Sequence, residues 1–299
     1  MTHRSGFACF VGRPNAGKST LLNAMIGAKV AITSDKPQTT RRAIRGILTR
    51  DDAQLVIVDT PGMHKPRTLL GERLDDLVRT VWSDVDVIGF CVPADQAIGP
   101  GDRRIAAELT DQAPRTPVIG IVTKTDKVRA EQVAAQLLAL SATREFAEVV
   151  PVSALAHDRV DLLADLLIAR LPEGPPLYPD GELTDEPLET LVAELIREAS
   201  LDGVRDELPH SLAVMVDEMG VREGRPGLTD IYATIFVERD SQKAIVLGRK
   251  GSRLGSVGAR ARAGIEELVG TQVYLNLHVT VAKDWQRDPK QLRKLGFDA

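Results

Sequence analysis

The chain has 299 residues, and at about 100–200 residues per domain this length predicts two domains, each able to bury its own core. With 43% hydrophobic and 27% charged residues, the composition excludes disordered and fibrous proteins. Two cysteines, Cys9 and Cys91, are too few for a disulfide framework or a cysteine-based zinc site. No apolar run reaches about 18 residues, and the first residues lack the apolar stretch of a signal peptide. We therefore expect a cytoplasmic protein that is not secreted and has no transmembrane segment.

The net charge of −4 argues at first against a nucleic-acid-binding protein, but the charge is unevenly distributed along the chain. Residues 171–239 hold 5 basic and 16 acidic residues, whereas residues 240–299 hold 11 basic and 6 acidic ones. Because the local balance says more about partners than the whole-chain sum does, we expect the C-terminal part to present a basic surface.

Up to about residue 170, short apolar runs alternate with segments of helical period. Runs of consecutive apolar residues suit strands buried on both faces, as in a parallel sheet covered by helices. The predicted strands are residues 7–11, 54–58, 86–92, 117–122 and 148–152. The predicted helices include residues 17–26, 69–82, 102–110 and 130–140. This alternation predicts a doubly wound α/β domain, whose ligands bind at the carboxyl ends of the strands.

The first predicted strand leads into a glycine-rich loop that fits the phosphate-binding pattern G-x-x-x-x-G-K-[ST] and then enters a helix. Its glycines let the backbone wrap around a phosphate, with the N–H groups and the helix N-terminus facing the negative charge. Lys18 supplies a positive charge to the β- and γ-phosphates, and the Ser19 hydroxyl supplies an oxygen ligand for Mg²⁺. The nucleotide-binding residues predicted here are Gly12, Arg13, Pro14, Asn15, Ala16, Gly17, Lys18, Ser19 and Thr20.

Two later segments can reach the terminal phosphate and its metal ion. Thr40 lies in a polar loop and can offer its hydroxyl to Mg²⁺ when a γ-phosphate is present. Asp59, Thr60, Pro61 and Gly62 end a predicted buried strand, where the carboxylate can hold the metal's water shell and the Gly62 N–H can reach the γ-phosphate. The predicted metal ligands are therefore Ser19, Thr40 and Asp59.

The ends of the next strands carry residues suited to a guanine base. Thr123, Lys124 and Asp126 follow the strand over residues 117–122, and the Asp126 carboxylate can accept hydrogen bonds from guanine N1–H and the exocyclic amine. Adenine offers no donor at its ring nitrogen there, so one carboxylate can separate GTP from ATP. Ser153 and Ala154 end the following strand, where a backbone N–H can meet guanine O6. Each short motif is weak alone, but all of them in this order predict a GTPase.

A cluster of prolines separates this half from the rest of the chain. Five of the 17 prolines lie within residues 172–187, and such a stretch cannot continue a helix or a central strand. We therefore predict a stiff linker over residues 172–187, between a nucleotide domain over residues 1–171 and a second domain over residues 188–299.

The second domain shows the order helix, strand, strand, helix, helix, strand. The predicted elements are residues 187–200, 211–217, 230–237, 242–247, 252–269 and 271–281. Between the two adjacent helices lies a Gly-x-x-Gly loop, by which KH domains grip a nucleic-acid backbone; its glycines allow close approach and its basic residues meet phosphates. The predicted RNA-binding residues are Gly248, Arg249, Lys250, Gly251, Lys243 and Arg253, with Arg260 and Arg262 extending the basic character. Lys283, Lys290, Arg293 and Lys294 are expected on a solvated helix face.

The whole set resembles the Era family of translation-factor-related GTPases, which carry a C-terminal KH domain. The resemblance covers essentially the whole chain, and its most specific features besides the motifs above are Asn15 and the loop with Thr33, Ser34, Pro37, Gln38, Thr39, Thr40 and Arg41. It implies a P-loop GTPase domain followed by an α+β type II KH domain. It also implies slow, Mg²⁺-dependent hydrolysis of GTP to GDP and phosphate, with catalysis assigned to Lys18, Thr40, Gly62 and Asn15.

The same resemblance implies the partners. They are the 3′ end of 16S rRNA and the precursor of the small (30S) ribosomal subunit, with GTP favouring the RNA-bound arrangement and hydrolysis favouring release. Peripheral contact with the inner membrane is reported for the family, although no amphipathic basic helix here supports it. We expect a monomer.

Two residues depart from common GTPase patterns. Thr123 stands where the guanine motif usually begins with asparagine, and its shorter side chain is expected to loosen the tie between the base-binding loop and the P-loop. Met63 stands where Ras-type enzymes have a water-orienting glutamine, but hydrophobic residues there are typical of the family that this chain resembles. Asn15 has two open interpretations: it helps to hold K⁺ near the phosphates, as in related GTPases, or it only stabilises the P-loop turn.

A rival hypothesis assigns the chain another class of function. In it, the protein is a regulatory RNA-binding module that senses guanine nucleotides or an alarmone and has negligible turnover.

Overall fold

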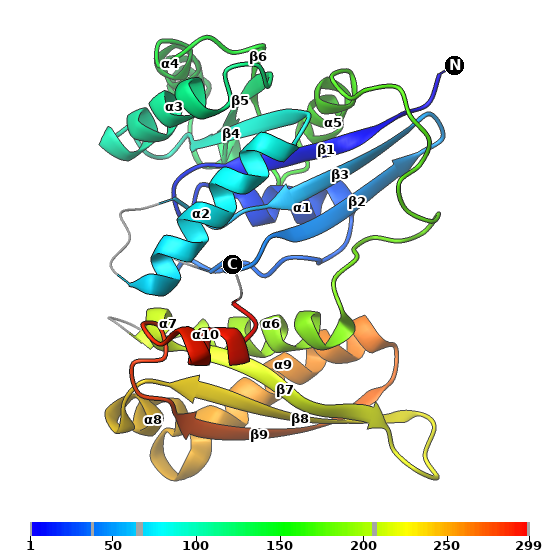
Figure 1. Ribbon diagram of the computed structural model, residues 1–299, viewed down its shortest axis with the longest axis vertical. Helices are drawn as coiled ribbons and strands as arrows, with labels where there is room; N and C mark the ends of the chain where they lie inside the picture. Colours follow the sequence, from blue (N-terminus) through cyan, green and yellow to red (C-terminus); the bar gives the residue numbers. More distant parts are fainter. Residues whose placement is uncertain (1, 37–38, 64–67, 205–207, 298–299) are drawn as a thin grey trace. The chain divides into compact units, whose positions relative to one another are not determined.

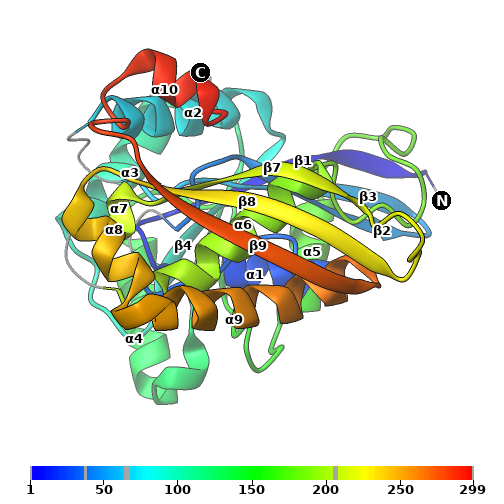
Figure 2. The same ribbon diagram turned by 90° about the horizontal axis from the view of Figure 1, so that it is seen from below.

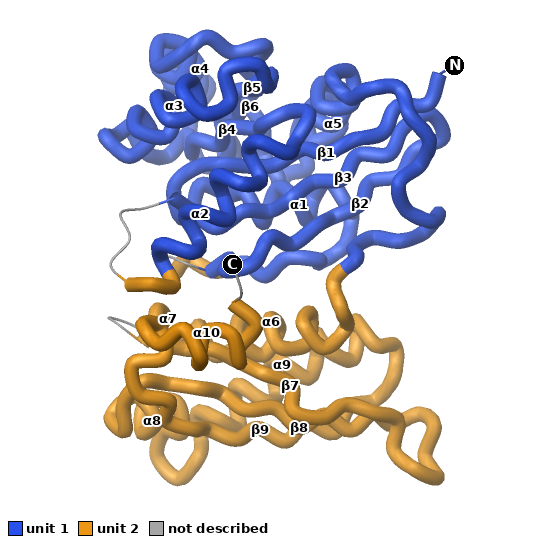
Figure 3. Tube along the Cα trace, viewed as in Figure 1, with its two compact units in different colours: residues 1–33, 38–66, 71–185 blue, residues 34–37, 67–70, 186–299 orange. Residues whose placement is uncertain are grey.

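The computed structural model describes residues 2–36, 39–63, 68–204 and 208–297 (Figure 1). The chain divides into two compact units, coloured separately in Figure 3. The first unit takes up the residues to 185 apart from two short segments, and the second takes up the residues from 186 onward together with those segments. Pro37 and Gln38, which contribute to the family resemblance, lie outside the described residues.

The first unit is built on a six-stranded sheet of order β2-β3-β1-β4-β5-β6. All neighbouring strands pair in parallel except β2 and β3, which are antiparallel. The strands are β1 (Arg4–Val11), β2 (Ile44–Arg50), β3 (Ala53–Asp59), β4 (Val87–Pro93), β5 (Val118–Thr123) and β6 (Glu148–Pro151). All seven residues of β3 and of β4 are buried, which is why these strands consist mostly of apolar residues. The doubly wound, mostly parallel fold is confirmed, and β2 is an edge strand that the periodicity did not predict.

Helices cover both faces of this sheet (Figure 1). They are α1 (Lys18–Ile26), α2 (Leu69–Asp84), α3 (Pro100–Gln112), α4 (Ala130–Ser141) and α5 (Val160–Ile168), with a short 3₁₀ helix, η1 (Thr125–Lys127), after β5. One core contains residues of α1 and α5, and the other contains residues of α2, α3 and α4. The nucleotide motifs follow the carboxyl ends of β1, β3 and β5, so the fold brings them to one edge of the sheet.

The proline-rich segment packs on the first unit. Its backbone pairs with β1, where Ser5 N donates to Pro172 O over 3.1 Å. The fully buried side-chain amide of Gln54 accepts from Leu177 N and Tyr178 N over 2.6 and 2.8 Å and donates to Tyr178 O over 3.0 Å. The two compact units divide after residue 185, so most of residues 172–187 are an ordered part of the first unit. The domain limits at residues 171 and 188 stay a prediction.

The second unit has a three-stranded sheet of order β7-β8-β9, antiparallel between the first two strands and parallel between the last two. Its elements are α6 (Leu188–Leu201), α7 (Leu208–Ser211), β7 (Ala213–Val221), β8 (Leu228–Val237), α8 (Asp240–Leu247), η2 (Arg249–Gly251), α9 (Ser252–Val269), β9 (Gln272–Val281) and α10 (Pro289–Lys294). α6 and α9 pack against each other and share a core with the sheet (Figure 2). The predicted order of elements is confirmed, with α7 and α10 as short additions, and Lys283, Lys290, Arg293 and Lys294 are exposed.

Candidate functional site

The P-loop connects β1 to α1 through three residues of positive φ. Gly12, Asn15 and Gly17 have φ angles of 153°, 63° and 91°, and asparagine is one of the few residues with a side chain that tolerates such a value. A Cβ on Gly12 would lie 2.5 Å from Cys91 O, so no side chain fits there. The residue types of this loop are therefore dictated by a tight turn against β4.

Lys18 is the first residue of α1 and is 6% exposed. Its Nζ donates to the carbonyl oxygens of Gly12 and Arg13 over 3.2 and 3.1 Å. Burial lowers the pKa of this ammonium group, and the negative charge of Asp59 opposes that effect. An ammonium group held in this way, beside a helix N-terminus, suits a polyphosphate.

Three oxygen-bearing side chains meet beyond Lys18. Ser19 Oγ donates to Asp59 Oδ2 over 2.5 Å, Thr40 Oγ1 donates to the same oxygen over 3.1 Å, and the two hydroxyls are 3.0 Å apart. Asp59 Oδ1 is buried and has no hydrogen-bond partner among the described residues. Burial raises the pKa of this carboxyl group, whereas Lys18 and the two hydroxyls lower it. Hard oxygen donors and an unsatisfied buried carboxylate oxygen fit Mg²⁺.

The segment after β3 lies directly against the P-loop. Thr60 Oγ1 donates to Phe10 O over 2.7 Å, and a Cβ on Gly62 would lie 2.7 Å from the backbone of Pro14. Gly62 is therefore needed for this close approach. Met63 is 3% exposed and belongs to a hydrophobic core, so in this structure its side chain packs in the protein instead of facing a phosphate.

A cavity of about 220 Å³ lies where a base would be expected. It is lined by Gly17, Thr20, Leu21, Thr33, Thr123, Lys124, Asp126, Lys127, Val152, Ala154 and Leu155. Ser153 Oγ donates to Asp126 Oδ1 over 2.6 Å and fixes the carboxylate that should read guanine. Burial lowers the pKa of Lys124, while the charge of Asp95 opposes this effect. Leu155, 75% exposed, was not predicted from the sequence, because an exposed leucine carries no motif.

The Thr123 hydroxyl reaches the P-loop directly. It donates to Ala16 O over 2.6 Å, and Thr123 and Ala16 are 4% and 1% exposed. The tie expected to be loosened by the shorter side chain is therefore present in this structure. Its effect on affinity stays a prediction.

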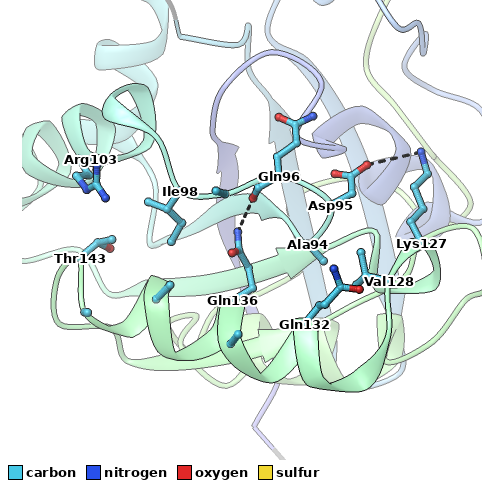
Figure 4. A pocket seen from close by; sticks show the side chains of 14 residues that line it. Ala94, Asp95, Gln96, Ile98, Arg103, Lys127, Val128, Gln132, Gln136 and Thr143 are labelled. Atoms are coloured by element: carbon cyan, nitrogen blue, oxygen red, sulfur yellow. Dashed lines mark hydrogen bonds and ion pairs between the residues drawn. The ribbon is translucent and has the colours of Figure 1, made fainter.

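A second, more open hollow of about 1030 Å³ lies beside the loop between β4 and α3 (Figure 4). Its lining includes Asp95 and Gln96 of that loop, Lys127, and Gln136 of α4. Gln136 Nε2 donates to Gln96 O over 2.9 Å, and Lys127 Nζ lies 4.0 Å from Asp95 Oδ2. The sequence did not predict this hollow.

In the second unit, the Gly-x-x-Gly loop joins α8 to α9. Gly248, Lys250 and Gly251 have φ angles of 69°, 52° and 78°, and a Cβ on Gly248 would lie 2.6 Å from Arg253 Cβ. Arg249 and Lys250 are exposed at the tip, and Ile245 of α8 is 52% exposed beside them. This arrangement presents two cations and an apolar side chain to a ligand.

Two of the predicted basic residues have contacts within the unit. Arg253 NH2 donates to Asp202 O over 2.6 Å, and Arg260 NH1 donates to Asp202 Oδ2 over 2.5 Å. Both side chains therefore join α9 to the end of α6. The RNA contact predicted for Arg253 stays a prediction. Lys243 is half-buried on α8, and Arg262 is exposed on α9.

Within the part of the chain that the structure describes, no helix combines the length and apolar character needed to cross a membrane.

Two family models match the chain. The model described as 50S ribosome-binding GTPase matches residues 7–124, and the KH domain model matches residues 207–286. The GTPase Era of Streptomyces coelicolor is 64% identical over 303 residues, covering 99% of this chain and 95% of that protein. The GTPase Era of Mycobacterium tuberculosis is 65% identical over 295 residues and covers 98% of both chains.

Solved structures show the same similarity. A crystal structure of Era in complex with MgGDPNP and nucleotides 1506–1542 of 16S ribosomal RNA has a TM-score of 0.95 and 36% identity, covering 99% of this chain and all of that one. An Era variant from Aquifex aeolicus bound to GDP·AlF₄⁻ has a TM-score of 0.94 and 36% identity over the same shares of the two chains.

Proposed function

The chain belongs to the Era family of GTPases, and we propose that it binds and hydrolyses GTP, binds the 3′ end of 16S rRNA through its KH domain, and assists assembly of the 30S subunit from its precursor. One observation carries the nucleotide part. The base cavity and the metal-binding set both adjoin the same P-loop, so Asp126 and Asp59 can act on the two ends of one nucleotide.

Hydrolysis would depend on electrostatic stabilisation of the transferring phosphoryl group. Ser19, Thr40 and Asp59 would hold Mg²⁺, which would supply positive charge at the phosphates. Lys18 neutralises charge on the β- and γ-phosphates, and the Gly62 N–H donates to the γ-phosphate. Because Met63 is a core residue, nothing at that position orients the attacking water, and we expect slow intrinsic turnover.

We also propose that Asn15 helps to hold K⁺ near the phosphates. The Asn15 side chain is exposed at the turn of the P-loop, where it is accessible to an ion. The alternative interpretation is that Asn15 only stabilises this turn, which its φ of 63° also fits. Turnover faster in K⁺ than in Na⁺ supports the K⁺ site, and equal turnover in the two buffers contradicts it.

The RNA part of the proposal rests on the loop from Gly248 to Gly251. Two exposed cations at a glycine-rich tip suit the phosphate backbone of a single strand. Ordering of the Thr40 and Gly62 loops by the γ-phosphate would bias the protein toward RNA binding, and hydrolysis would favour release.

RNA crosslinking with GTP, with GDP and without nucleotide tests partner and coupling together. Enrichment of the 3′ end of 16S rRNA only with GTP is the expected result. Binding that is unchanged by combined Gly248→Asp and Gly251→Asp substitutions would contradict the role of the KH loop. Phosphate release under single-turnover conditions separates this proposal from a regulatory module that senses nucleotide or alarmone without turnover.

We place the protein in the cytoplasm and expect any contact with the inner membrane to be peripheral. Liposome flotation tests that contact.

A further inference from the structure

Asp102, in the first turn of α3, is a fully buried carboxylate outside the nucleotide motifs. Its Oδ1 accepts from Arg13 Nε over 2.7 Å, and its Oδ2 accepts from Gly99 N over 2.8 Å. A carboxylate at 0% exposure is costly unless it is paired, so the guanidinium of Arg13 compensates for its burial. A residue of the P-loop is thus anchored by its side chain to a helix 89 positions away in the sequence.

The backbone of the anchored residue touches one catalytic group and adjoins another. Arg13 O accepts from Lys18 Nζ over 3.1 Å. The next residue, Pro14, provides the surface against which Gly62 fits without a Cβ. A shift of the P-loop at Arg13 and Pro14 would therefore move the surroundings of both Lys18 and Gly62.

The loop between β4 and α3, which leads to Asp102, is held in place by hydrogen bonds to neighbouring elements. Gln136 of α4, 8% exposed, donates to Pro93 O over 3.1 Å and to Gln96 O over 2.9 Å, as the close view shows for Gln96 (Figure 4). Ala94 N donates to Thr123 O over 2.8 Å. The loop that leads into α3 is thereby fixed to β5 and α4, as the support of a positioned group requires.

We propose that Asp102, acting through Arg13, is a positioning residue for GTP hydrolysis. It holds the P-loop backbone so that Lys18 and the Gly62 N–H meet the γ-phosphate in the transition state. The proposal rests on the GTP hydrolysis proposed above. GDP has no γ-phosphate, and its diphosphate is held by the loop N–H groups and the helix N-terminus, so its affinity depends less on this anchor.

The test compares Asp102→Asn with Asp111→Asn, the same substitution at an exposed position of the same helix. We expect Asp102→Asn to lower kcat about tenfold or more, since small displacements of reacting groups cost factors of this order, and to change the Kd for GDP less than about threefold. Asp111→Asn should leave both unchanged. Arg13→Gln should lower kcat similarly, and the double variant should lose little more, because both substitutions break the same Arg13–Asp102 ion pair.

An unchanged kcat, an equal proportional loss of kcat and GDP affinity, or additive losses in the double variant would overturn the positioning role. If Asp102→Asn fails to fold, the test uses Arg13→Gln, which breaks the same ion pair at its partly exposed residue. A fall in kcat without a matching rise in the Kd for GDP then supports the positioning role. A wild-type protein without turnover contradicts the proposed function itself. Normal wild-type turnover with unaffected variants contradicts only the role of Asp102.

Discussion

Thr123 tests how firmly the base-binding segment must be held to the P-loop. Its buried hydroxyl donates to Ala16 O over 2.6 Å. Thr123→Val keeps a β-branched side chain of similar shape and removes the donor, so the Ala16 carbonyl loses this partner. A hydrogen bond contributes about 0.5–1.5 kcal/mol net, and a buried group left unsatisfied costs about 1–3 kcal/mol.

This free energy should appear both in folding and in binding. We expect the free energy of unfolding of the nucleotide-free protein to fall by about 1–3 kcal/mol. Binding of the nucleotide must then also order the less firmly held contact between the base-binding segment and the P-loop. GDP should therefore bind up to about tenfold more weakly, at about 1.4 kcal/mol per factor of ten. Most of the change should lie in the dissociation rate.

Titration with a fluorescent GDP analogue, its displacement kinetics and urea unfolding measure these quantities. Thr110→Val is the matched control, because Thr110 is exposed on α3 and its hydroxyl only donates to Ala106 O within the helix. If Thr123→Val unfolds at the same urea concentration as wild type and binds GDP equally well, the tie does not support the site.

Three further expectations follow from buried groups. Burial raises the pKa of Asp59, and Mg²⁺ needs the ionised carboxylate. Mg²⁺-dependent nucleotide binding should therefore weaken as the pH falls through this raised pKa, which lies above that of an ordinary aspartate. The nucleotide Kd measured at a series of pH values in the presence of Mg²⁺ tests this. Gln54→Leu should lower the free energy of unfolding by about 3 kcal/mol or more, because it leaves several backbone groups of the proline-rich segment without hydrogen-bond partners. Amide hydrogen exchange in that segment should become faster, and unchanged exchange would show that Gln54 does not hold the segment in place. Burial raises the pKa of Cys91 to about 12, so alkylation of Cys9 and Cys91 should be absent in the native protein and complete in guanidinium chloride.

The sequence predicted the P-loop, the Asp59–Gly62 segment and the base-binding motifs because each follows a mostly apolar strand, and the carboxyl ends of such strands share one edge of a parallel sheet. It did not predict β2, because the glycine and the two arginines of this segment interrupt both the continuous apolar run and a regular apolar–polar alternation. It also left out α5, where a short leucine-rich run does not distinguish a buried helix from a strand.

Long-range contacts were beyond sequence reasoning. The prolines show that residues 172–187 cannot form a helix, but only the structure shows that Gln54, inside a predicted buried strand, binds their backbone. Arg253 shows the same limit, because its position beside the KH loop predicts a phosphate contact but does not reveal that its guanidinium also donates to Asp202 O. The sequence shows which hydrogen bonds or ion pairs a side chain is able to form, whereas the fold decides which partner lies beside it.

Different residues of the nucleotide site are therefore suited to recognising guanine and to holding the P-loop in position. Asp126 is the residue proposed to read the base, and its carboxylate accepts a hydrogen bond from Ser153 Oγ. Thr123 and Asp102 instead bind the backbone and side chain of the P-loop from neighbouring elements. Because neither of these two ties touches the groups that distinguish guanine from adenine, breaking them should change dissociation rates or turnover while the preference for guanine persists. Loss of that preference should require a change at Asp126 or at the hydroxyl that orients it.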